Sequence, residues 1–339
     1  MACMMGCQHE QTDVVKPDDG RIWLSANISP SITTRTPYDL TTPTTENSLD
    51  AAIWASTSGD FCHNDESTTT TLEYHTSVLF QSGEKQLLRR EVTYPDEGTT
   101  VNFIGLCPNS GWSSNAPSAA NTTSSFTFSG KTDLMYAPQV TGHIGGPVVP
   151  ALHFYHLLTW LRVKVKAENE DVISSWGKLQ SITLSDKKAT LNVDLTSSLA
   201  PVLDTQSGTG KVWFTGDAAS RSFYIKGTDT QFSYTGSYGV TLSTTATEEA
   251  YILCEPVKAT AGDVDSRTNE YVLVLNTEHR SGVTVNVDLK TAADTWFEGS
   301  TMGHQFVLEL NFTAGGYISA SATVTDWTTG GYVEKNVAE

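Results

Sequence analysis

The residues of this chain that could carry out chemistry are few and widely separated. Five cysteines stand at positions without regular spacing: Cys3, Cys7, Cys62, Cys107 and Cys254. An odd number at irregular spacing does not make a disulfide framework, and no pair has the spacing of a zinc finger. Cys62, followed by His63 and Asp65, could suggest a metal site, but an accidental cluster in a polar loop explains it better. Cys107 and Cys254 adjoin apolar strand residues, and we expect both to behave as small buried hydrophobic groups.

Known catalytic motifs are missing from the sequence. No glycine-rich loop precedes a predicted helix, and neither a Gly-x-Ser-x-Gly elbow nor a His-Glu-x-x-His pair occurs. The histidines are scattered singly, and we expect His156 to have a structural role. A carboxylate pair for glycoside hydrolysis meets only in the folded protein, so that alternative stays open; Glu298 and Asp326 stand in predicted loops, where solvated acids are expected. We therefore predict no enzyme activity, no metal and no cofactor.

The clearest chemical signal lies at the N-terminus. The run Met1-Ala2-Cys3-Met4-Met5-Gly6-Cys7 is short and apolar, and it ends in a small residue followed by cysteine. It resembles the last part of a bacterial lipoprotein signal, without the basic n-region and most of the hydrophobic region. We predict that Cys7 carries the lipid and that residues 8–19 form a polar tether; the alternative is an ordinary cysteine in a disordered start. Several acyl groups anchor a protein stably, whereas one chain anchors it only marginally.

The composition indicates the fold class and excludes several partners. The chain has 339 residues, 17% of them charged, and a net charge of −17. Serine and threonine make up roughly a quarter of the chain, which favours strands and turns and excludes long helices and coiled coils. The 8 Trp, 12 Tyr and 12 Phe supply core material and argue against disorder. The acidic charge argues against nucleic acid as a partner and fits a solubility role at a cell surface.

Strand signals recur along most of the chain. Residues 21–28 alternate, with Ile22, Leu24, Ala26 and Ile28 on one face. Helical periodicity is scarce, and only residues 50–54 and 291–296 are expected to form a helical turn or two. Further short strands, with turn residues between them, are predicted at 69–80, 91–94, 101–106, 157–166, 179–184, 189–195, 211–215, 222–225, 250–254, 271–275, 283–289, 304–312 and 317–324.

The middle of the chain carries the strongest break. Gly142-His143-Ile144-Gly145-Gly146-Pro147, followed by Pro150, separates two strand-rich halves. Many short strands over this length argue for an all-β protein with two β-sandwich domains. We place them at residues 21–148 and 149–339, after a signal remnant and tether at 1–20. In the strand at 157–166, one face is predicted to be buried and the other solvated, with Leu161, Val163 and Val165 inside and Trp160, Arg162, Lys164 and Lys166 outside.

Four pieces of sequence stand out by their order and spacing. They are Ile22-Trp23-Leu24-Ser25-Ala26-Asn27-Ile28 with Thr34-Arg35-Thr36; Phe126-Thr127-Phe128 with Asp133-Leu134-Met135-Tyr136-Ala137; Phe154-Tyr155-His156-Leu157-Leu158 with Leu161-Arg162-Val163-Lys164-Val165; and Trp296-Phe297-Glu298-Gly299, Val307-Leu308-Glu309-Leu310 and Ala322-Thr323-Val324-Thr325-Asp326-Trp327. Each piece alone is weak evidence of relationship, but together the four pieces span nearly the whole chain. In this pattern the chain resembles the fimbrillin (Mfa-like) family of Bacteroidales, the subunits of surface pili assembled from lipoprotein precursors.

The resemblance implies a fold and a route of assembly. The fold would be two transthyretin-like β-sandwich domains, and the export route that of a lipoprotein with its lipid on Cys7. An arginine-specific protease would remove the N-terminal segment with the first strand, and a strand from another subunit would fill the exposed groove. The expected cut follows Arg35, beyond the strand that carries Ile22, Leu24, Ala26 and Ile28. Arg21 is the alternative, although a cut there would leave the strand in place; Arg35 could also be a simple loop cation.

We therefore expect a structural and adhesive pilus subunit at the cell surface, in the outer membrane and fimbrium. Its partners would be other fimbrial subunits, an arginine-specific protease, the outer membrane through the lipid, and ligands on host or bacterial surfaces. Residues 328–339 would make a poor donor strand, which favours a tip or accessory position. One alternative is a glycan-binding outer-membrane lipoprotein with an exposed tryptophan as its sugar platform. A secreted glycosidase is the third hypothesis.

Overall fold

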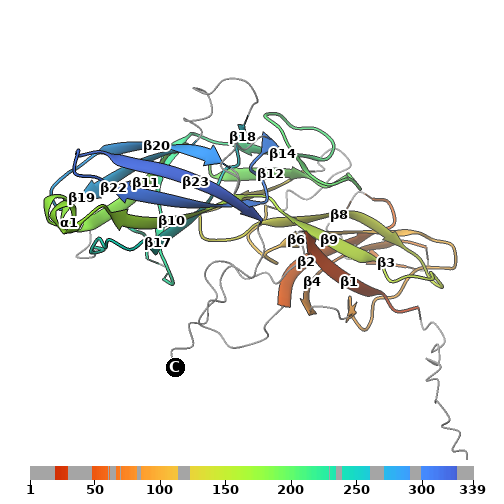
Figure 1. Ribbon diagram of the computed structural model, residues 1–339. Helices are drawn as coiled ribbons and strands as arrows, with labels where there is room; N and C mark the ends of the chain where they lie inside the picture. The colour runs from red at the N-terminus through yellow and green to blue at the C-terminus, as the bar shows by residue number, and fades with distance from the viewer. Residues whose placement is uncertain are drawn as a thin grey trace, which may run out of the picture.

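The structure is a computed structural model of the chain, and it describes residues 20–29, 48–59, 61, 66–68, 70–81, 85–113, 123–228, 230–233, 239–259, 271–290 and 299–326. Regular structure in these residues is almost entirely β-strand, so the predicted all-β class is confirmed. The one helix in the described part is α1 (Glu170–Trp176). Figure 1 shows two large groups of strands along an elongated molecule, with α1 at the far end of one group and β1 and β9 in the other.

The first large sheet has eight strands in the order β3-β4-β2-β6-β8-β9-β1-β5. Their bounds are β1 (Trp23–Ser29), β2 (Ser48–Ser56), β3 (Glu66–Ser67), β4 (Leu72–Gln81), β5 (Gln86–Leu87), β6 (Val101–Cys107), β8 (Met135–Gly142) and β9 (Ala151–His156). All neighbours are antiparallel except β1 and β9, which run parallel. The edge strand β5 also contacts β4, near the other edge. The sheet therefore curls around an apolar core that includes Ile53, Phe103 and Phe154.

The second large sheet has nine strands in the order β15-β11-β19-β20-β23-β22-β10-β17-β16. Their bounds are β10 (Thr159–Ala167), β11 (Leu179–Lys187), β15 (Ala219–Ser222), β16 (Tyr224–Ile225), β17 (Thr247–Cys254), β19 (Tyr271–Thr277), β20 (Val283–Lys290), β22 (His304–Phe312) and β23 (Ile318–Asp326). Only Phe223, which is fully buried, separates the edge strands β15 and β16 along the chain. The sheet therefore closes on itself around a core that includes Leu161, Trp176 and Phe306.

Two smaller sheets complete the described fold. One has the order β13-β14-β12-β7, and the other pairs β18 with β21. Their bounds are β7 (Thr123–Thr127), β12 (Thr190–Asp194), β13 (Val202–Leu203), β14 (Lys211–Thr215), β18 (Lys258–Ala259) and β21 (Gly299–Ser300). A third apolar cluster, the shared core, takes side chains from all three larger sheets, such as Trp54, Trp160 and Phe214. The two large sheets are therefore joined through a packed interior.

Residues 50–54, expected to form a helical turn, are part of strand β2, so that expectation was wrong. Ala51 and Ile53 point into the core of the first sheet, whereas Ala52 and Trp54 point into the shared core. A strand buried on both faces lacks the apolar–polar alternation by which strands are recognised. The second expected helical turn, at 291–296, lies outside the described residues.

One expected strand is replaced by a single bridge, and one helix was not predicted. Residues 91–94 form a single bridge between Arg21 and Thr93 in place of a strand. Helix α1 was missed. Its cap is Asn169, whose side chain accepts a hydrogen bond from the backbone N–H of Val172 at 3.0 Å. A helix of seven residues is too short to show the repeat on which sequence recognition depends.

The glycine- and proline-rich break at 142–150 is the connection between β8 and β9. β9 follows it and pairs with β8 and β1 in the first sheet. The chain passes to the second sheet later, between β9 and β10, at Leu157 and Leu158, which are fully buried. The division into domains at residue 148 stays a prediction, and the sheet pairing extends the first sheet past it.

The packing of Gly105 yields a stability test of the first sheet. A Cβ atom at this position of β6 would lie 2.5 Å from Cζ of Phe154 and 3.3 Å from Cδ1 of Ile53. We expect Gly105→Ala to lower the free energy of unfolding by about 1–3 kcal/mol, the usual effect of overpacking a core, in urea denaturation. Gly208→Ala is the matched control, since its Cβ would meet only the flexible Lys211 side chain, at 3.2 Å. Equal losses in both variants would contradict this account.

Candidate functional site

β1 fills a slot in the first sheet between β9 and β5. Its second half runs parallel to β9, with Ser25 opposite Ala151, and its first half runs antiparallel to β5, with Trp23 opposite Leu87. The Ser25 N–H donates to the carbonyl of Pro150 at 3.0 Å. β1 is therefore an inner strand, held by neighbours along both edges.

Three of the four side chains predicted to face inward lie at the core side of this slot. Ile22 and Leu24 are fully buried, and Ala26 is half-buried against the same core. The backbone of Ile28 lies opposite Phe154, and the placement of its side chain lies outside the description. An apolar slot with backbone hydrogen-bonding groups along both edges can take up one extended segment of alternating sequence, because those edges must be paired when they are shielded from water.

The other predicted site residues cannot be placed around this slot. Cys7 and Arg35 lie outside the described residues. Arg21, the alternative cleavage point, is half-buried, and its guanidinium carbon lies 5.8 Å from the centre of the Trp23 ring. Arg21 also forms the bridge with Thr93, so it is part of the folded edge of the first sheet.

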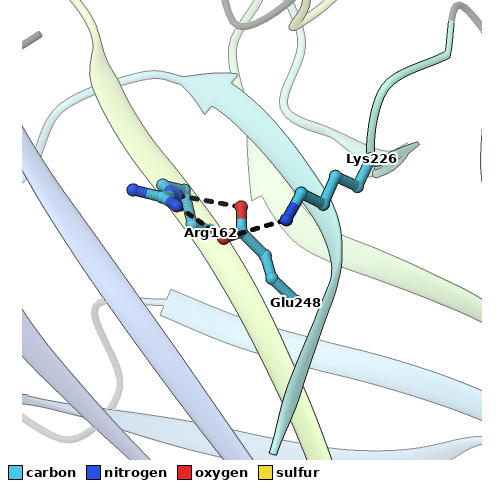
Figure 2. Close-up of polar contacts among 3 residues, drawn as sticks. All are labelled: Arg162, Lys226 and Glu248. Atoms are coloured by element: carbon cyan, nitrogen blue, oxygen red, sulfur yellow. Dashed lines mark hydrogen bonds and ion pairs between the residues drawn. The ribbon is translucent and has the colours of Figure 1, made fainter. Parts of the chain in front are cut away.

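The sequence analysis did not predict a second site, which is polar and lies in the second large sheet. Glu248 of β17 accepts two hydrogen bonds from the guanidinium of Arg162 on β10, at 2.9 Å from Nε and 2.5 Å from Nη2. Nζ of Lys226 lies 3.8 Å from the same carboxylate. Figure 2 shows the carboxylate of Glu248 between the two cations. The side chains of Arg162 and Glu248 are only 9% and 6% exposed, so the solvated face predicted for this part of β10 is wrong at Arg162.

A bulge in β17 creates this ion pair. Val163 lies opposite Ala250, but Lys164 lies opposite Glu248, so Glu249 is an extra residue on β17. Directly opposed residues share a face of a sheet, and the bulge thus turns Glu248 to the face of Arg162 and Lys164. Trp160, also predicted to be solvated, is buried in the shared core, with its ring 5.3 Å from the guanidinium carbon of Arg162. No alternation pattern in the sequence signals a bulge.

Comparison with known proteins identifies the family. The family described as fimbrillin-like matches residues 34–327 of this chain. The chain belongs to the fimbrillin-like family. Among proteins with curated functions, none matches the chain. Fimbrillins are structural and adhesive proteins of fimbriae, so membership supports a pilus subunit at the cell surface that assembles with other fimbrial subunits.

Solved structures share the fold of this fimbrillin. A protein from Bacteroides uniformis, provisionally named a cell adhesion protein, is 16% identical, with a TM-score of 0.50 over 91% of this chain and 100% of its own. A second such protein, from Bacteroides ovatus, is 15% identical, with a TM-score of 0.50 over 91% of this chain and 98% of its own. At this level of identity the likeness shows the fold alone.

Most of the tryptophans that the structure describes in this fimbrillin lie in the interior. Trp54, Trp160, Trp176 and Trp213 are buried, whereas Trp23 is 38% exposed. Trp112 is half-buried, with its ring 5.2 Å from that of Phe126. Trp296 and Trp327 lie outside the described residues. Among the described tryptophans, Trp23 is thus the one with the largest exposed surface.

The cysteines and histidines show no shared site in the described part of the fimbrillin. Cys107 and Cys254 are free thiols, and no three His, Cys, Asp or Glu side chains there lie in a position to hold a metal ion. Cys62 and His63 lie outside that part. His156 is buried, with Nδ1 2.8 Å from the carboxylate of Asp133. No helix among the described residues has the length and apolar character that a membrane crossing requires.

The buried ion pair leads to a prediction about stability. Glu248→Gln removes the counter-charge of the buried Arg162, and we expect the free energy of unfolding to fall by about 3–5 kcal/mol, measured by urea denaturation. Glu309→Gln is the matched control: its partner Lys166 lies on the same strand β10 but the pair is partly exposed, so a loss below about 1 kcal/mol is expected.

A second pair of variants separates the charge effect from packing. Arg162→Met combined with Glu248→Leu removes both charges and fills the space with apolar groups, so it should recover most of the stability. If Glu248→Gln costs no more than Glu309→Gln, the pair does not depend on burial and the account is wrong.

The thiols lead to a prediction about reactivity. Burial raises the pKa of Cys254 to about 12, and burial together with Asp133 and Asp50 raises that of Cys107 well above its ordinary value. Since only the thiolate reacts, iodoacetamide at about pH 8 should leave both unmodified in the native protein and alkylate both in urea. Peptide mass spectrometry gives the readout. Modification of Cys254 at equal rates in the two states would show that it is accessible in the native protein.

Proposed function

We propose that this fimbrillin is a pilus subunit that is exported as a lipoprotein, held on the outer membrane through Cys7, and assembled by strand exchange after β1 has been removed. The observation that supports this most is the position of β1. It is an inner strand, and yet it comes first in the described chain, so it can leave without threading any other segment through the fold. A strand from another subunit would then occupy its slot.

The position of Arg35 suits this role. It follows the end of β1 at Ser29 and precedes the start of β2 at Ser48. A cut after Arg35 separates β1 from the remaining chain and leaves it held by non-covalent contacts. A cut after Arg21 would fall before β1, which begins at Trp23, and would leave it attached.

After β1 has left, filling the slot with another strand lowers the free energy more than leaving the slot empty. Ile22 and Leu24 are fully buried, and burial of each such side chain is worth about 1.5–3 kcal/mol. Loss of β1 also leaves the facing edges of β9 and β5 unpaired. An incoming strand with apolar residues at alternate positions recovers both contributions, which is the physical basis of donor-strand exchange.

A tip or accessory position in the pilus is part of the proposal. The segment 328–339 has few apolar residues, namely Tyr332, Val333 and Val337, and would make a poor donor strand for a following subunit. A subunit that accepts a strand but is a poor donor would form short oligomers by itself and would lie at the end of a longer polymer. Such a position also suits contact with ligands on host or bacterial surfaces.

One observation favours the alternative of a glycan-binding outer-membrane lipoprotein. Trp23 is 38% exposed, and an exposed indole ring can stack on a sugar. A glycan-array signal that Trp23→Ala abolishes, in a chain that never polymerises, would favour this alternative over the pilus subunit.

Proteolysis tests the proposed assembly. An arginine-specific protease acting on the purified full chain should release a fragment that ends at Arg35 and convert the remainder to oligomers, because the emptied slot takes up a strand. Intact-mass spectrometry and light scattering give the readout. Arg35→Ala should stay uncut there and monomeric, whereas Arg21→Ala, the matched control, should be processed and assemble. A precursor cut at Arg35 that stays monomeric would argue against strand exchange, and one cut elsewhere would argue against the site.

A further inference from the structure

The outer side of β1 and β5 carries basic and aromatic side chains, whereas their buried side is apolar. Trp23 is 38% exposed and lies directly opposite the half-buried Leu87. The guanidinium of Arg21 lies over the Trp23 ring at 5.8 Å. On the β5 side, Lys85, Arg89 and Arg90 are all exposed. We call this surface the basic aromatic face; its members are Arg21, Trp23, Lys85, Arg89 and Arg90.

The charge of this face is opposite to that of the whole chain. The protein has 21 Lys and Arg against 38 Asp and Glu, yet four cations gather here. Among the described residues, Glu91 has its carboxylate 2.5 Å from Nε of Arg89, a side chain that also donates to the hydroxyl of Tyr74 at 2.6 Å and is 55% exposed. Neither Lys85 nor Arg90 has an ion pair in the part of the chain that the structure describes. Among the residues named here, four cations therefore stand against one acid.

An exposed apolar group lies at the same end of the sheet. Val148, in the connection between β8 and β9, is 78% exposed. This connection ends at Pro150, which bonds to Ser25 of β1, and its Ile144 lies 3.5 Å from the position of a Cβ on Gly20. The described chain begins at Gly20, so the N-terminal residues join the fold beside Val148 and the basic aromatic face.

We propose that the basic aromatic face docks the precursor on a lipid surface of anionic phosphate headgroups. Tryptophan is the side chain that prefers the membrane–water interface, and lysine and arginine near the surface are attracted by anionic headgroups. The proposal rests on the proposed function in one respect. A lipid on Cys7, 20 − 7 = 13 residues before Gly20, would keep this end within about 45 Å of the bilayer, the length of an extended tether.

The same proposal gives a second effect to the cut at Arg35. Trp23 and Arg21 belong to the segment that leaves, whereas Lys85, Arg89 and Arg90 remain with the subunit. Cleavage would therefore remove the lipid and, at the same time, the aromatic half of the docking face. A subunit that has exchanged its strand is expected to detach from the membrane surface.

Vesicle binding tests the proposal without the lipid. The full chain carrying Cys7→Ala, which cannot be acylated, is sedimented with vesicles of phosphatidylcholine alone or with roughly one third phosphatidylglycerol. We expect binding to the anionic vesicles only, and its loss at about 0.5 M salt, because the attraction is electrostatic. Lys85→Gln with Arg90→Gln should weaken binding by about fivefold for each cation removed. Trp23→Thr should weaken it further, and thermal unfolding checks that each variant is folded.

The matched control removes two cations from the other half of the chain, by Lys178→Gln and Lys258→Gln, both exposed. It should leave vesicle binding unchanged. Equal loss in the control, or no binding to anionic vesicles, overturns the proposal. Glycan binding that needs Trp23, without vesicle binding, would make the face a saccharide site and overturn it as well. Whether Cys7 carries lipid in cells is read separately by mass spectrometry, so failure of the lipoprotein proposal and failure of the docking face can be told apart.

Discussion

One continuous segment, residues 151–167, supplies an inner strand to each of the two large sheets and thereby ties the sheets together. Its first part, β9, pairs parallel with β1, and its second part, β10, pairs parallel with β22. Between them Leu157 and Leu158 are fully buried in the shared core. The slot that holds β1 is therefore built on the same segment as the core of the second sheet, so the slot is fixed to a large folded body.

Buried polar groups hold this segment in register at three points. His156 is paired with Asp133 at 2.8 Å, the hydroxyl of Thr159 donates to the carbonyl of Thr301 at 2.8 Å, and Arg162 is paired with Glu248. Each partner lies on a different part of the chain. Apolar packing tolerates sliding, whereas a buried hydrogen bond between charged or polar groups is lost when its partner moves. These pairs are therefore suited to specify how the two sheets are joined, at a cost in desolvation that apolar side chains would not have.

Much of the fold could be predicted because several strands alternate between buried and partly exposed side chains. The strand at 304–312 alternates in this way and was predicted with the bounds that the structure has, and the alternation at 21–28 is typical of a strand with one buried face. The strand at 211–215 was also predicted with its observed bounds, although three successive residues in it are buried. Prediction failed where both faces are buried, as in β2, because burial on two sides removes the alternation.

It also failed at Arg162, since a charged residue is assigned to solvent unless its partner is known. That partner, Glu248, is 86 residues away and reaches Arg162 only through a bulge. For the slot that holds β1, one part was predictable from the sequence and one was not. Its occupant was predictable from local alternation, but its parallel neighbour, β9, is far along the chain, and nothing local indicates which strand pairs with β1.

The floor of the slot includes contacts between side chains of the first sheet other than those of β1. The ring of Phe154 lies over Gly105, where the absence of a side chain leaves room for it, and its centre is 6.3 Å from that of Phe80. These contacts are made across the sheet and do not involve β1. β1 and the residue before it add two fully buried side chains, Leu24 in the strand and Ile22 just before it, and backbone hydrogen bonds that any extended segment can make. The contacts of β1 therefore depend on an alternating pattern more than on a particular sequence, which is the condition that the proposed strand exchange requires.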